Sequence, residues 1–345
     1  MLFMTNNKIN NINNSSTQES ANVLFQECLH GIDLVTNHAI QVFDIVENVL
    51  FYPYDFQYIK SFVPLWMCNT GRTPESQLSK EIFEKLICSC KDELTNRILY
   101  WYDLQSIIVA LQDRIESVKY IMEELYKLVP NHVIRNDRDY TSAVRVMNKK
   151  STLVHTFINE IFVLLASSFD LFTKIVYELE NLNTIDFSIY RELKSKGVLY
   201  SPNKIKNEKL KEEGLIFSKL PILRKVCSFR DFYVHNGAWD YRCTIYEAMI
   251  KGEPVDTFVL LPDVNEYGTF EKYKSRSMFY SKGEKINVTL PQMVLDIMKI
   301  YDNSIQLLID LYSPKECEQG SVPDNFEVIV RNWNKAFWSI NKKNI

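Results

Sequence analysis

The chain has 345 residues, of which 46% are hydrophobic and 24% are charged, with a formal net charge of −3. This is the composition of a globular protein with one large core or two lobes, and the charge excludes a uniformly basic surface while leaving room for a local basic patch. No unbroken run of about 18 apolar residues is present, so we expect no membrane-spanning segment.

The first 18 residues are rich in Asn and Ser and lack a positively charged region leading into an apolar core. They predict a disordered leader rather than a secretory signal. The seven cysteines are an odd number without paired CxxC spacing. They favour free thiols in a reducing cytoplasm over a metal site. We therefore expect a cytoplasmic protein with no metal and no cofactor.

Residues 19–148 predict an N-terminal helical region. Apolar residues recur at steps of three and four over 21–51, the pattern of one or two amphipathic helices, and a proline-broken connector covers 53–66. The triplet Thr73-Pro74-Glu75 is a helix-start signal. The longest helical pattern covers 93–128 and is followed by a proline. A lobe boundary is expected in the polar stretch that precedes residue 149.

The segment 151–182 predicts a central, buried helix because it is apolar around most of its circumference. One narrow stripe on it is polar, and the stripe consists of His155, Asn159, Ser167, Asp170 and Lys174. Two interpretations remain open. The stripe is either a solvent-facing edge or a set of residues that support a functional site.

A polar, lysine-containing connector separates that helix from a second predicted helix at 217–235. Alternating apolar and polar residues with turn glycines then predict a small β-hairpin insertion at about 238–290, and we expect strands to be confined to this segment. An amphipathic helix follows at 290–313, and residues 316–345 form a C-terminal helix or tail. The fold class expected is mainly α, a helical bundle with a small β-hairpin insertion, in which 149–315 is one domain and the helices 151–182 and 217–235 pack antiparallel.

Two residues of types that often act on phosphate groups lie near the end of the 217–235 helix. Arg230 precedes His235 by five positions, and Asn236-Gly237 follows where a left-handed helix cap is favoured. Arginine binds phosphate oxygens through a fixed, permanently charged fork, and histidine transfers protons near neutral pH. The pair is thus a minimal set for metal-independent RNA cleavage. The alternative is that His235 only interacts with the negative end of the helix dipole.

The stretch "FRDFYVHNG" resembles the R-x4-H motif of the HEPN superfamily, and "VHTFINEIFVLLASSFDLFTKI" resembles the helix that packs beside it. The similarity covers about 150–315 and is closer to bacterial members than to well-studied ones. The resemblance implies a helical bundle and a metal-independent endoribonuclease with a composite site in a homodimer. It makes Arg230 and His235 the catalytic pair. The residue after the arginine is Asp231, which fits the motif.

Further residues are expected to support this site, namely Asp231, Asn236, Asp170 and Asn159. HEPN toxins regulated by a nucleotidyltransferase partner often carry a tyrosine two positions after the histidine. Gly237 occupies that position here, so the resemblance does not extend to that form of regulation. A regulatory protein partner of another kind remains an expectation.

Two basic clusters are candidates for RNA binding. The first, on the connector and the start of the 217–235 helix, contains Lys204, Lys206, Arg224 and Lys225. The second interleaves cations and aromatic residues within the β insertion, namely Lys272, Lys274, Arg276 and Lys282 with Tyr273, Phe279 and Tyr280. A solvated linker and ordinary hairpin decoration are the respective alternatives.

Two functions follow from these patterns. The first is an RNA-cleaving toxin or antiviral defence effector with RNA as substrate. The second is a non-catalytic HEPN module that binds nucleotides or nucleic acid or acts as a scaffold, with the Arg/His pair retained as structure.

Overall fold

The structure is a computed structural model that describes residues 14–129, 142–240, 242–313 and 315–341. Most of the predicted leader, residues 1–13, lies outside the described residues. Helix α1 (Asn14–Phe51) begins inside the predicted leader, so the expectation that all of 1–18 is non-helical is wrong at its end. The apolar periodicity expected from residue 21 continues as a single helix through residue 51.

The chain forms two compact units, and each is assembled from three separate segments. The first unit consists of residues 1–36, 114–167 and 213–302, and the second consists of 37–113, 168–212 and 303–345. The boundary predicted near residue 148 falls inside the first unit. The compact units therefore do not coincide with consecutive stretches of sequence.

The protein is mainly helical, as predicted. The long helices α1, α5 (Glu93–Leu128), α6 (Lys149–Asn181) and α8 (Ile286–Leu311) each contribute residues to both units. The remaining α-helices are α2 (Phe56–Lys60), α3 (Leu65–Asn69), α4 (Lys80–Ser89), α7 (Pro221–Asn236) and α9 (Phe326–Asn341). Three short 3₁₀ turns lie in the connector before α7, at Leu182–Thr184, Pro202–Lys204 and Glu208–Lys211.

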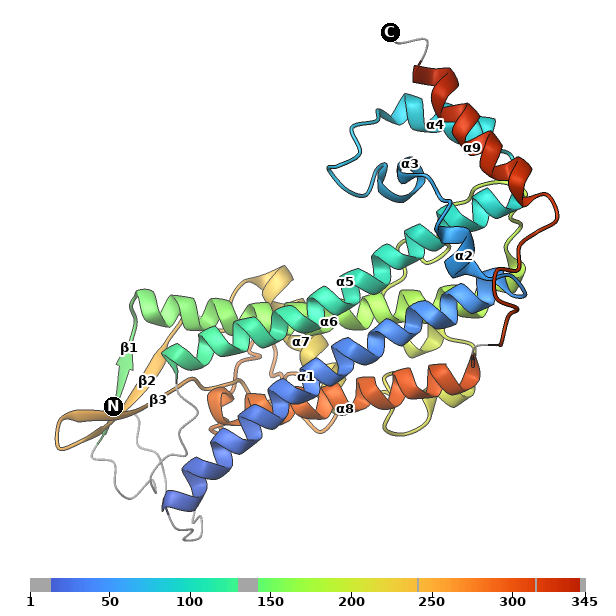
Figure 1. Ribbon diagram of the computed structural model, residues 1–345. Helices are drawn as coiled ribbons and strands as arrows, with labels where there is room; N and C mark the ends of the chain where they lie inside the picture. Colours follow the sequence, from blue (N-terminus) through green and yellow to red (C-terminus); the bar gives the residue numbers. More distant parts are fainter. Residues whose placement is uncertain (1–13, 130–141, 241, 314, 342–345) are drawn as a thin grey trace. The chain divides into compact units, whose positions relative to one another are not determined.

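One predicted helix start is corrected. The Thr73-Pro74-Glu75 signal lies in a loop, and α4 begins seven residues after Thr73, at Lys80. Ser79 caps this helix, because its hydroxyl accepts a hydrogen bond from the backbone N–H of Ile82 at 3.3 Å. Figure 1 shows α4 beside α9 within the second unit.

The sheet has three antiparallel strands in the order β1 (Ser142–Val146), β2 (Ile245–Ile250), β3 (Glu253–Phe258) (Figure 1). The predicted hairpin is β2–β3, and it turns at Lys251-Gly252, where both residues have positive φ (50° and 89°). Such a two-residue turn matches the twist of the strands that it joins. The prediction that strands are confined to 238–290 is wrong, because β1 pairs with the free edge of β2.

The core of the first unit joins α6 to α7. The ring of Phe162 stacks on that of Phe229 with centroids 4.6 Å apart. Asn159, one turn earlier on α6, contacts Trp239, which lies after the end of α7. These contacts show that α7 and the segment after it pack on α6, and the antiparallel orientation of the two helices stays a prediction.

The second unit contains a buried carboxylate. Glu178 on α6 is fully buried, and it accepts hydrogen bonds from the hydroxyl of Tyr100 and from the backbone N–H of Ser195. A second buried link joins α9 to α5, since the indole of Trp333 donates to the hydroxyl of Thr95 at 2.7 Å. Satisfied buried polar groups of this kind specify one packing arrangement.

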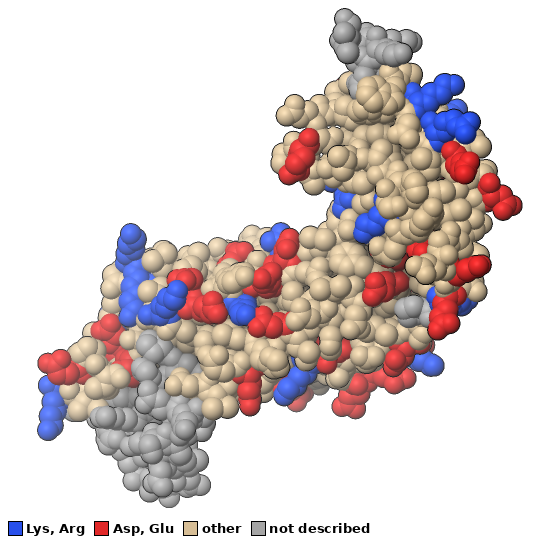
Figure 2. All heavy atoms as spheres, viewed as in Figure 1, with Lys and Arg blue, Asp and Glu red and all other residues tan. Residues whose placement is uncertain are grey.

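Residues 149–184, α6 and the turn after it, contain a window with a mean hydropathy of 1.4 and are long enough to cross a membrane. The sequence expectation considered only unbroken apolar runs, and isolated polar residues interrupt this one. The protein buries 61% of that window, as the core helix of a globular protein does. On the face in Figure 2, acidic and basic side chains are interspersed, in keeping with the small net charge.

Candidate active site

Helix α7 carries the predicted catalytic pair. Pro221 occupies its first turn, where a missing N–H costs nothing, and Gly237 ends it with φ of 86°. The N–H of Gly237 donates to the carbonyl of Tyr233 at 3.1 Å. The Asn236-Gly237 pair is therefore a helix end, as expected from its sequence.

Arg230 and His235 have different environments. The Arg230 side chain is 25% exposed, and its Nε lies 2.9 Å from a carboxylate oxygen of the neighbouring Asp231. His235 and Asn236 lie exposed in the last turn of α7. Within one chain, His235 can reach an external substrate, while the guanidinium of Arg230 already lies beside a carboxylate.

The two side chains point to different sides of α7. Five residues at roughly 100° each turn the helix by about 500°, so Arg230 and His235 lie about 140° apart around its axis. One copy of the chain therefore does not aim both groups at the same phosphate. A site that uses both groups needs either a loosened last turn of α7 or a second copy of the helix.

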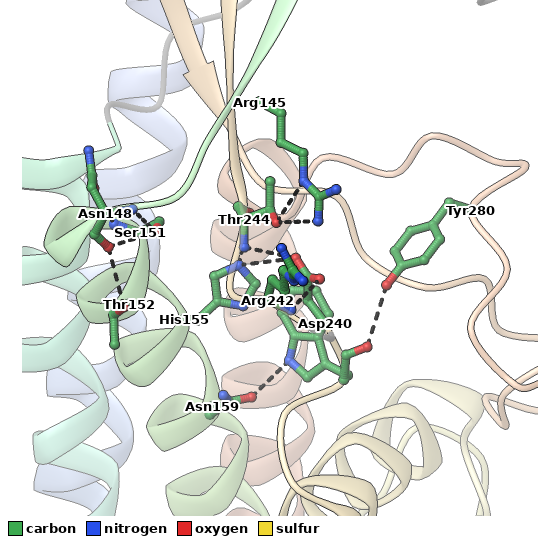
Figure 3. Close-up of polar contacts among 11 residues, drawn as sticks. Arg145, Asn148, Ser151, Thr152, His155, Asn159, Asp240, Arg242, Thr244 and Tyr280 are labelled. Atoms are coloured by element: carbon green, nitrogen blue, oxygen red, sulfur yellow. Dashed lines mark hydrogen bonds and ion pairs between the residues drawn. The ribbon is translucent and has the colours of Figure 1, made fainter. Parts of the chain in front are cut away.

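The segment after α7 is fastened to α6 by two buried polar residues (Figure 3). Asn159 accepts a 2.8 Å hydrogen bond from the indole of Trp239, which also packs at 4.7 Å from the imidazole of His155. His155 contacts the carbonyl of Thr244 through Nε2 at 2.9 Å. Of the three stripe residues in this unit, His155 and Asn159 are buried and hold this segment, and Ser167 is partly exposed, so the stripe is not a solvent-facing edge.

His155 is a neutral, structural histidine in this arrangement. Its Nε2 carries the proton because a carbonyl oxygen only accepts hydrogen bonds. Burial lowers the pKa of His155, although the bond to Thr244 and the Asp240 carboxylate act in the opposite direction. Within the part of the chain that the structure describes, its buried Nδ1 has no hydrogen-bond partner.

The same cluster includes Asp240, Thr244 and Arg145, which the sequence did not indicate, and Tyr280, which it indicated only as a candidate for RNA binding. Asp240 accepts from the N–H of Thr244 at 2.8 Å, and Arg145 on β1 donates to the Thr244 hydroxyl at 3.1 and 3.2 Å. The hydroxyl of Tyr280 lies 3.5 Å from the carbonyl of Trp239 (Figure 3). The sequence signal for this attachment of the segment to α6 is a tryptophan, Trp239, soon after the end of a predicted helix.

The other predicted site residues are distributed over both units. Asp170 belongs to the second unit, where it accepts a hydrogen bond from the N–H of Tyr200 at 2.7 Å. Its position in the second unit does not test the supporting role that we predicted for it.

The candidate RNA-binding cations are also divided. Lys204 and Lys206 lie exposed in the second unit, and the ammonium of Lys206 donates to Asn181 at 2.7 Å. Arg224 is exposed on α7 in the first unit, and Lys225 is paired with Glu284 at 2.7 Å. The four cations therefore belong to two units and do not form a single cluster within either one.

Over the described residues, no group of three or more His, Cys, Asp or Glu side chains is arranged to hold a metal ion. The seven cysteines are free thiols. Comparison of the chain with protein-family models, curated proteins and solved structures gives no match.

Proposed function

We propose that this chain is a metal-independent endoribonuclease of the HEPN type. The observation that supports the proposal is the exposed imidazole of His235 in the last turn of α7, with Arg230 one to two turns before it. That helix end is held on α6 by contacts on both sides, since Phe229 precedes His235 and Trp239 follows it. A proton-transfer group held in this way is positioned before substrate binds.

In the reaction, the 2′-oxygen of a ribose loses its proton and attacks the adjacent phosphorus. The bond from phosphorus to the 5′-oxygen breaks, and that oxygen gains a proton. The products end in a 2′,3′-cyclic phosphate and a 5′-hydroxyl. His235 transfers protons, and Arg230 stabilises the charge of the pentavalent phosphorane.

A homodimer provides an arrangement of Arg230 and His235 around one phosphate that a single copy of α7 does not. Because Arg230 and His235 face different sides of α7, we place the site where two copies of α7 meet about a two-fold axis. Two histidines then serve as general base and general acid. The setting we propose is a cytoplasmic toxin or antiviral effector whose activity is controlled by a protein partner.

A non-catalytic RNA-binding or scaffolding role is the second candidate. The ion pair between Arg230 and Asp231 favours it, because a guanidinium engaged by its neighbour is less available to a phosphate. The two candidates differ in whether RNA is cut.

The deciding experiment incubates purified protein with end-labelled RNAs of mixed sequence in the presence of EDTA. The proposal expects fragments that end in 2′,3′-cyclic phosphate, identified by mass spectrometry. Binding of RNA without cleavage under all conditions supports the second candidate. Cleavage that chelation abolishes contradicts the metal-independent mechanism.

A further inference from the structure

The loop of residues 263–284, called here the aromatic loop, lies directly against α7. The hydroxyl of Ser228 donates to the carbonyl of Gly268 at 3.0 Å. The ring of Phe270 packs against Phe229 and Phe232 on α7, with centroid distances of 4.8 and 5.6 Å. The loop and the helix that carries His235 therefore form one surface.

A close backbone approach holds this contact. A Cβ atom on Gly268 would lie 2.1 Å from the carbonyl oxygen of Pro221 and 2.8 Å from the nitrogen of Lys225, and the φ of Gly268 is 77°. Glycine alone satisfies both requirements at low cost. The contact brings the loop backbone onto the first turn of α7.

The two ends of the aromatic loop are tied together at Asp263. Its buried carboxylate accepts hydrogen bonds from the N–H and hydroxyl of Ser281 at 2.7 and 2.6 Å and from the N–H of Lys282 at 3.0 Å. Burial alone would raise the pKa of Asp263, but these hydrogen bonds outweigh it and hold the pKa below its ordinary value. The loop is thus closed and held in place.

The outer side of this loop presents aromatic rings to solvent. Tyr267 is 60% exposed, Tyr273 is 66% exposed, and Phe279 and Tyr280 are each more than a third exposed. Tyr273 begins a tight turn that is closed by two hydrogen bonds between its backbone and that of Arg276, at 2.8 and 2.9 Å. Rings held in this way can stack on unpaired bases at little entropic cost.

Cations accompany these rings. Lys272, Lys274 and Arg276 are exposed, and the ammonium of Lys274 lies 5.6 Å from the ring centroid of Tyr273. Lys282 is engaged by Glu271 at 3.2 Å, and Glu266 is an exposed acid on the same loop. Three cations beside exposed rings suit a strand that has both bases and phosphates.

The same strand can reach the proposed catalytic histidine. Angles around the axis of α7 can be measured from Ser228 at about 100° per residue. Arg224 and His235 then lie about 40° and about 20° from Ser228 in the same direction, whereas Arg230 lies about 160° from it. Ser228 is the residue that contacts the loop. Arg224 and His235 therefore share the loop-contacting side of the helix and are separated by about 16 Å along it.

We infer that the aromatic loop, with Arg224, is a binding surface for single-stranded RNA that leads the strand to His235. This inference rests on the proposed ribonuclease function for its substrate. Bases in a duplex are stacked on each other, so their faces cannot stack on the tyrosine and phenylalanine rings. The surface therefore selects unpaired RNA.

The test measures binding of a fluorescent, 2′-O-methylated single-stranded RNA of about 20 nucleotides by anisotropy. This probe has no free 2′-hydroxyl and cannot be cut by the proposed reaction. We expect Tyr267→Ala and Tyr273→Ala each to weaken affinity about tenfold, and Tyr273→Phe to keep it. The triple variant Lys272→Gln, Lys274→Gln and Arg276→Gln should reduce the slope of log affinity against log salt by about 2.

The matched controls are Tyr120→Ala, which removes an exposed tyrosine of α5, and Lys196→Gln, which removes an exposed lysine of the second unit. We expect both to leave RNA binding unchanged. Unchanged affinity in the loop variants, equal affinity for duplex RNA, or binding only to anionic lipid vesicles overturns the inference. Binding that depends on the loop without any cleavage of natural RNA supports it while contradicting the ribonuclease. Cleavage with an unchanged KM in the loop variants contradicts the inference alone.

Discussion

The side-chain oxygen of Asn159 accepts a 2.8 Å hydrogen bond from the indole of Trp239, four residues beyond His235. Both residues are buried. The bond joins the first third of α6 to the segment that leaves α7. Together with the ring contact of Phe229 on Phe162, it holds the end of α7 on the core of its unit, close to the proposed catalytic histidine.

Asn159→Ala leaves the buried indole N–H of Trp239 without an acceptor, which should destabilise the protein by about 1–3 kcal/mol. Chemical denaturation measures this loss. A double-mutant cycle with Trp239→Phe should give a coupling energy of about 0.5–1.5 kcal/mol. Additive effects of the two substitutions would show that the bond contributes nothing of its own.

Arg230→Ala and His235→Ala should each lower RNA cleavage about 10²–10⁴-fold, since they remove charge stabilisation and proton transfer. The free energy of unfolding should fall by less than about 1 kcal/mol, because a partly exposed ion pair and a dipole contact contribute no more. Initial cleavage rates and thermal melts test both statements.

The matched controls for this pair are His30→Ala and Arg331→Ala, which remove an exposed histidine and an exposed arginine elsewhere in the chain. They should keep full activity. Loss of stability without loss of cleavage in the α7 variants would assign Arg230 and His235 a purely structural role.

A homodimer is expected because one copy of α7 points Arg230 and His235 about 140° apart. Light scattering at micromolar concentration should give twice the chain mass, and activity per chain should fall on dilution below the dissociation constant. A monomer that cleaves RNA at full rate would contradict the composite site.

Stability should fall as pH decreases below 6.5, the ordinary pKa of histidine, because burial lowers the pKa of His155 in the folded protein. Between the folded value and 6.5 the unfolded chain binds a proton that the native state does not, so acid favours unfolding. His155→Gln keeps a donor for the Thr244 carbonyl and does not titrate. Urea denaturation from pH 8 to 5 should show a smaller loss in this variant, and parallel curves would contradict the assignment.

Gly268→Ala should detach the aromatic loop from α7, because the added Cβ would overlap the Pro221 carbonyl. We expect a stability loss of about 2–4 kcal/mol, within the range of severe single substitutions. The matched control is Gly283→Ala, which also has positive φ but meets no atom within 4 Å, and its cost should be only about 1 kcal/mol. Equal effects of the two would show that the loop does not depend on this contact.

Local patterns in the sequence determined the helices. Apolar residues at steps of three and four predicted the bodies of α1, α5, α6, α7 and α8, and the glycines at 237 and 252 predicted the helix end and the hairpin turn. These features depend on residues within one or two turns of each other, so they can be predicted from residues that are close together in the sequence.

Tertiary structure decided how those elements meet. β1 has a mostly exposed sequence and becomes a strand only because β2 offers it an edge. Asn159 and Trp239, 80 positions apart, meet because α7 and the segment after it pack on α6, and the aromatic loop reaches α7 through the carbonyl of Gly268. Hydrogen bonds and ring contacts of this range have no local signal, since each depends on a partner that only the folded chain brings near.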